Sequence, residues 1–115
     1  MLNEELKDLV IQALEDIKGL EIVSLDISSQ TDISDYMVVA SGSTSRQVKA
    51  LVNNVVVEAK KAGFEPLGVE GLEQGEWVLV DLTDVIVHVM LPMVRDFYDL
   101  ENLWNMTPGQ SEENS

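Results

Sequence analysis

The chain contains no cysteine among its 115 residues. Disulfide bonds, thiolate metal sites and cysteine nucleophiles are therefore excluded, and this composition suits a reducing cytoplasm. The acidic, amphipathic start MLNEELKDLV does not resemble a secretory signal. No apolar run approaches the roughly 20 residues that a membrane-spanning helix needs. We expect a cytoplasmic domain with no membrane contact.

Basic residues are also scarce, with 7 Lys and Arg against 21 Asp and Glu and a formal net charge of -14. Nucleic-acid binding depends on cations that neutralise phosphates, so we expect no direct DNA binding. An acidic surface is better matched to a basic protein. The alternative is that the charge serves solubility alone.

Hydrophobic spacing divides the chain into helices and strands. Apolar residues at helical spacing predict helices over residues 3–18 and 45–62, and a third that begins at Pro92 and carries Met93, Phe97, Leu100 and Trp104 on one stripe. Alternating or continuous apolar runs predict strands at 21–27, 36–41, 66–70, 76–82 and 85–90. Thr83-Asp84 forms a two-residue connection between the last two strands.

The order α-β-β-α-β-β-β-α predicts an α+β fold. A crossover unit over residues 36–70 favours two parallel strands, and the hairpin adds antiparallel ones. We expect a single two-layer domain over residues 1–106, with a mixed sheet of about five strands and helices mainly on one face. Residues 107–115 are rich in Gln, Ser, Glu and Asn, which predicts a disordered acidic tail.

Several patterns invite an enzymatic interpretation. Gly42-Ser43-Thr44-Ser45 follows a strand, but it lacks the Lys of a P-loop, so a helix cap is the better interpretation. A triad of Ser43, His88 and Asp81 is an alternative that the spacing does not require. Asp81 and Asp84 flank a turn, where carboxylates usually bond the backbone, with a divalent metal as the alternative. We predict no cofactor, no metal and no catalysis.

Several segments together carry a family resemblance. They are DYMVVASGSTSRQVKALVNNV, PLGVEG, WVLVDLTDVIVHVM and RDFYDLENLW. In this combination the chain closely resembles the Iojap-like family, the ribosomal silencing factors. The resemblance implies a nucleotidyltransferase-like fold without known transferase activity. It further implies binding to protein fourteen of the large ribosomal subunit, which hinders joining of the small subunit and slows translation when nutrients are scarce. The aspartate pair of a nucleotidyltransferase metal site is missing after Gly42-Ser43.

The last two strands suggest where such a partner binds. Their uniformly apolar face should pack against the helices, which leaves a mixed face open to a partner. We predict that partner contacts come from Trp77, Asp81, Asp84, His88 and Met90, with Tyr98 and Glu101 on the last helix.

Other arrangements remain open. A helix or a second copy of the chain, in a homodimer, could cover the open face instead. The basic residues Arg46, Lys49, Lys60 and Lys61 of the 45–62 helix either contact ribosomal RNA at the rim or are simply solvated. The competing functions are a divergent nucleotidyltransferase-like enzyme and a dimeric scaffold without a ribosomal role.

Overall fold

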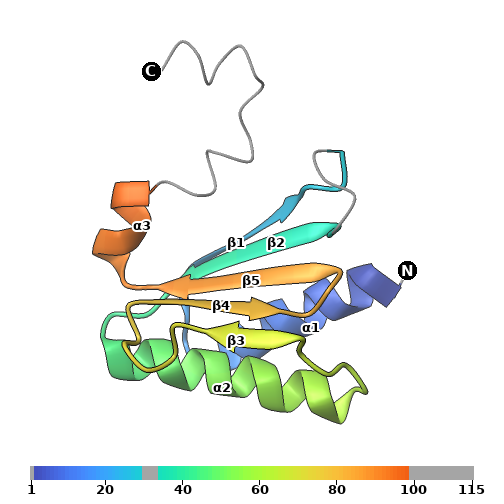
Figure 1. Cartoon of the computed structure of the whole chain (residues 1–115), viewed down its shortest axis with the longest axis horizontal. Coiled ribbons are helices and arrows are strands. Elements are labelled where there is room, and N and C mark those ends of the chain that lie inside the picture. Colours follow the sequence, from blue (N-terminus) through green and yellow to red (C-terminus); the bar gives the residue numbers. More distant parts are fainter. Residues whose placement is uncertain (1, 30–33, 99–115) are drawn as a thin grey trace.

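The computed structural model describes residues 2–29 and 34–98, and the side chains of 4–29 and 34–95 (Figure 1). Its helices are α1 (Leu2–Asp16), α2 (Ser45–Lys61) and α3 (Pro92–Tyr98). Its strands are β1 (Leu20–Asp26), β2 (Tyr36–Ser41), β3 (Gly68–Glu70), β4 (Trp77–Asp81) and β5 (Val85–Met90). The predicted order of helices and strands is confirmed. The predicted tail at 107–115 lies outside the described residues, as does the last helix beyond Tyr98.

The five strands form one mixed sheet in the order β1-β2-β5-β4-β3. Strands β2 and β5 pair in parallel, whereas the β1–β2, β3–β4 and β4–β5 pairs are antiparallel. The expected crossover therefore places β3 in the same direction as β2 but at the far edge of the sheet. The hairpin of β4 and β5 lies between them, because β5 rather than β3 pairs with β2.

Helices α1 and α2 lie together on one face of the sheet, so the domain has two layers (Figure 1). Between the layers is the main core, which includes Leu6, Val10 and Leu14 of α1, Val48, Leu51, Val52 and Val55 of α2, and Val38, Ala40, Val78, Val80, Val85, Val87 and Val89 of the sheet. Burial of this apolar surface is the main stabilising contribution. The α+β class, the mixed sheet and the predominantly one-sided helices are confirmed.

Helix α2 shows how burial overrides local preference. Its N-terminus is capped by Thr44, whose hydroxyl accepts a hydrogen bond from the Gln47 N–H at 3.1 Å. The run Val55-Val56-Val57 disfavours a helix because branched side chains lose rotamer freedom there. Val55 is nevertheless fully buried against the sheet. The capping interpretation of the Gly42–Ser45 segment is confirmed.

The opposite face of the sheet, here called the open face, carries a smaller apolar cluster. Its buried members are Ile27, Met37, Val39 and Met90, and Leu25, Trp77 and Val94 pack against them. The sequence places Met90 correctly on this face but wrongly on its exposed surface, because Met90 has no accessible area. The reason is α3, which begins two residues later and brings Val94 onto the cluster. In the described part of the chain, no helix has the length and apolarity to cross a bilayer.

Candidate partner-binding site

The pairing register of β3, β4 and β5 determines which side chains lie at the centre of the open face. Glu70 of β3 pairs with Leu79 of β4, which in turn pairs with His88 of β5. Residues directly opposite one another in a sheet point to the same face, so these side chains form one row. Trp77 lies two residues before Leu79 in β4 and therefore also points to the open face.

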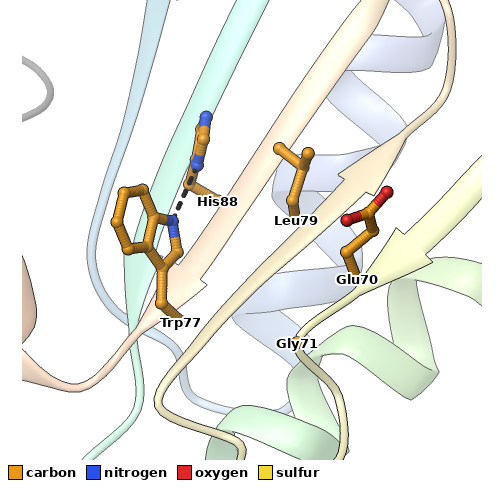
Figure 2. Close-up of a pocket in the computed structure, with 5 residues that line it drawn as sticks. All are labelled: Glu70, Gly71, Trp77, Leu79 and His88. Carbon is orange, nitrogen blue, oxygen red and sulfur yellow. Dashed lines mark hydrogen bonds between the residues drawn. The ribbon is translucent and has the colours of Figure 1, made fainter.

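Trp77 and His88 are joined by a hydrogen bond. The Trp77 Nε1–H donates to His88 Nδ1 at 3.0 Å, and the ring centroids are 6.0 Å apart (Figure 2). An indole nitrogen only donates, so Nδ1 must be unprotonated and the imidazole carries its proton on Nε2. Burial lowers the pKa of His88 to about 4 from 6.5. Near neutral pH His88 is therefore uncharged.

A shallow pocket of about 320 Å³ opens over this row, lined by Glu70, Gly71, Trp77, Leu79 and His88. Figure 2 shows the Trp77 and His88 rings on one side of Leu79 and the Glu70 carboxylate on the other. Glu70 is exposed, whereas Trp77, Leu79 and His88 are half-buried. The pocket thus combines apolar and aromatic walls with a single carboxylate, which suits recognition of a cationic group.

Gly71 holds the edge of the pocket close to β4. Its φ of +85° is a left-handed conformation that side chains rarely adopt. A Cβ atom at this position would lie 2.2 Å from the backbone oxygen of Trp77. Only glycine allows the backbone after β3 to pass so close to the backbone of Trp77. This close contact also fixes the position of Glu70, the residue before Gly71.

The two predicted aspartates lie beyond the pocket, at the β4–β5 turn. The Asp81 carboxylate accepts a hydrogen bond from the Thr83 N–H at 2.9 Å, which confirms the turn interpretation. The Asp84 carbonyl oxygen accepts from the N–H groups of Asp35 and Tyr36 at 2.8 and 3.2 Å. Both side chains remain partly exposed, so they can border an interface.

The two predicted residues of the last helix receive no side-chain description. Tyr98 ends α3, where only the backbone is described, and Glu101 lies outside the described residues. Contacts through either residue therefore stay predictions.

The structure does not assemble the alternative catalytic triad. The Ser43 hydroxyl donates to the Gln47 side-chain oxygen at 2.7 Å, near the start of α2. Asp81 is bonded to Thr83 and His88 to Trp77, so the described hydrogen bonds link none of the three to another. Among the residues whose side chains are described, no three His, Asp or Glu groups gather closely enough to hold a metal ion.

Most of the positively charged residues lie in the helix layer, whereas the segment of β3 and β4 carries only negative charge. Six of the seven Lys and Arg residues belong to α1, to the turn that follows it, or to α2: Lys7, Lys18, Arg46, Lys49, Lys60 and Lys61. The seventh, Arg95, is 5% exposed and donates to the Ser41 hydroxyl at 3.2 Å. Residues 65–84, which contain β3 and β4, include six acids and no Lys or Arg. The open face is therefore bordered by negative charge, and the α2 cations lie on the other layer.

The sequence prediction did not select Glu70, Gly71 or Leu79 as partner contacts, although all three line the pocket. The alternation of side chains along β4 already placed Leu79 on the same face as Trp77. Leu79 was not selected as a partner contact because its side chain has no polar or charged group. Glu70 ends, and Gly71 directly follows, a three-residue strand whose pairing partner no local pattern specifies. The glycine itself was a usable signal, because glycine at a strand end often marks close backbone approach.

Comparison with known proteins gives consistent matches along the chain. A family model described as "Ribosomal silencing factor during starvation" matches residues 2–115. A ribosomal silencing factor RsfS of Chromobacterium violaceum is 57% identical over 101 residues, which are 88% of this chain and 83% of that protein. The RsfS protein of Haemophilus influenzae is 41% identical over 86% of this chain and 97% of its own length. A crystal structure of a C. violaceum protein superimposes with a TM-score of 0.90 at 55% identity, covering 94% of this chain and 91% of that one.

Proposed function

The chain belongs to the ribosomal silencing factor family, and from this premise we propose that it binds protein fourteen of the large ribosomal subunit and blocks joining of the small subunit. The family description names starvation, which supports repression of translation under nutrient limitation. The proposed site of action is the cytoplasm, where ribosomal subunits meet.

The observation that carries this proposal is the half-buried apolar and aromatic centre of the open face, as the described residues show it. Trp77, Leu79, Ile86 and His88 are half-buried there, and no described helix covers them as α1 and α2 cover the other face. Aromatic and aliphatic side chains at the centre of a patch, with charges around it, are typical of a protein interface. The negative border favours a basic partner and would speed its association.

The proposed mechanism needs no chemical step. A bound domain occupies part of the surface that the small subunit requires, so the two compete for the free large subunit by mass action. The effect then depends on the concentrations of factor and small subunit and on the affinity of each. The proposal therefore describes a regulatory protein and not an enzyme.

Co-sedimentation with purified ribosomal subunits tests the proposal. We expect the chain to sediment with large subunits and not with small ones, and to bind isolated protein fourteen. Leu79→Lys places a positive charge at the centre of the open face and should abolish binding. Val57→Lys is the matched control, because Val57 lies on α2 in the other layer and is 38% exposed.

Two outcomes would contradict the proposal. One is that the wild-type chain fails to sediment with large subunits. The other is that the two lysine variants, both folded by circular dichroism, bind equally well. A second copy of the chain is the rival occupant of the open face. If Leu79→Lys dissociates a dimer while ribosome binding is unchanged, the open face is a self-association surface instead.

A further inference from the structure

We infer that the pocket lined by Glu70, Gly71, Trp77, Leu79 and His88 receives one arginine side chain of the partner protein. The inference rests on the proposed function, because it assigns the chemistry of the group that the open face recognises. Its basis is a carboxylate, an apolar floor and an imidazole in one row of the sheet, Glu70, Leu79 and His88, with the Trp77 ring beside that row.

The spacing of the row suits a long side chain with a planar end. Neighbouring strands lie about 4.8 Å apart, so Glu70 on β3 and His88 on β5 are separated by roughly 10 Å with Leu79 between them. An aliphatic stem can pack on Leu79 while a guanidinium reaches Glu70. The volume of about 320 Å³ is at the lower end for small-molecule pockets, as expected for a single side chain.

The electrostatics of the pocket favour a cation. Glu70 is the only charged group among the five lining residues, since His88 is neutral near pH 7. None of the ion pairs among the described residues involves Glu70. Residues 65–84 contain no Lys or Arg that could neutralise it. An incoming cation would therefore meet no positive charge at the pocket.

Arginine fits these walls better than lysine. Its planar guanidinium can form two parallel hydrogen bonds to a carboxylate and can stack on an aromatic ring. Trp77 provides such a ring, held in place by its hydrogen bond to His88. That bond leaves the His88 proton on Nε2, where it can donate to a backbone carbonyl of the same partner segment. Lysine, a compact and strongly hydrated charge, would gain less from the flat walls.

A small probe tests the pocket directly on the full chain. Nα-acetyl-arginine amide is titrated against ¹⁵N-labelled protein while the indole N–H resonance of Trp77 is followed, assigned with a Trp104→Phe variant. We expect a saturable shift with the arginine amide, and affinity at least about tenfold lower for the uncharged citrulline amide. Equal shifts with both amides would refute an arginine site.

Glu70→Gln and its control Glu73→Gln extend the test to the partner. Both residues are exposed acids near the end of β3, but only Glu70 lines the pocket. We expect Glu70→Gln to weaken probe binding and large-subunit binding by about tenfold, and Glu73→Gln to change neither by more than about twofold. Equal large-subunit binding by these two variants would refute the inference and leave the proposed function intact. Failure of the wild-type chain to bind large subunits would instead refute the proposed function.

Discussion

Acidification from about pH 7 to about pH 5 should destabilise the folded protein through His88. In this range His88 binds a proton more readily in the unfolded chain than in the folded one. Burial lowers the pKa of His88 to about 4 from an ordinary 6.5. Protonation would also remove the Nδ1 acceptor of the Trp77 N–H. His88 is the only histidine, so no other side chain of ordinary pKa changes charge in the middle of this range.

The sign and size follow from the two pKa values. Above pH 6.5 the imidazole is neutral in both states, and its contribution to the free energy of unfolding is complete. As the pH falls from 6.5 towards 4, only the unfolded chain becomes protonated, so stability declines; below about 4 the contribution is fully lost. The loss is about 2 kcal/mol at pH 5 and about 3 kcal/mol in total, on the order of 1.4 kcal/mol for each unit of pKa shift.

Urea unfolding at a series of pH values measures this loss. His88→Gln is the comparison, because the glutamine side-chain oxygen can still accept from Trp77 but does not titrate. Carboxylates begin to protonate near pH 5, and their contribution is common to both proteins. We expect the free energy of unfolding of the wild type to fall more steeply than that of His88→Gln, by about 2 kcal/mol between about pH 7 and about pH 5. Parallel pH profiles would refute the assignment of a buried, neutral His88.

Three further substitutions test other parts of the structure. Gly71→Ala should lower the free energy of unfolding, measured with urea, by about 3 kcal/mol, because its Cβ would meet the Trp77 carbonyl. Gly63 has a similar positive φ but open space around it, so Gly63→Ala should lower the free energy of unfolding by only about 1 kcal/mol in the same assay. Ser43→Ala should keep large-subunit binding within about twofold, since the described bond of its hydroxyl is to Gln47 at the start of α2. A nucleotide turnover that this variant abolishes would contradict the non-catalytic assignment. Asp84→Lys should slow association with large subunits mainly at low salt, and an equal loss at high salt would place Asp84 in the interface centre instead.

Local sequence patterns were sufficient for the main elements of the fold. The helical spacing of Val48, Leu51, Val52 and Val55 identifies the buried side of α2 because an apolar stripe has to face the core. Alternation in β4 and β5 separates Val78 and Val80 from Trp77 for an equally local reason, since neighbouring strand residues point to opposite faces. Family membership was also recognisable from the sequence, because it depends on residue identity in order.

Pairing between distant segments was decided only by the tertiary structure. Glu70, Leu79 and His88 form one row because β3 and β5 pair on the two sides of β4 in a fixed register. A shift of one residue in either pairing would move a side chain to the opposite face, and no pattern within a three-residue strand specifies that register.

The burial of Met90 and the neutral state of His88 both result from contacts with other segments of the folded chain. The sequence shows that both residues point away from α1 and α2. It does not show that Val94 of α3 returns onto the cluster around Met90, or that Trp77 donates to His88. Side-chain direction is a property of the strand, so the sequence alone determined it. Exposure and pKa depend on which other segments pack against that strand, and those contacts exist only in the folded domain.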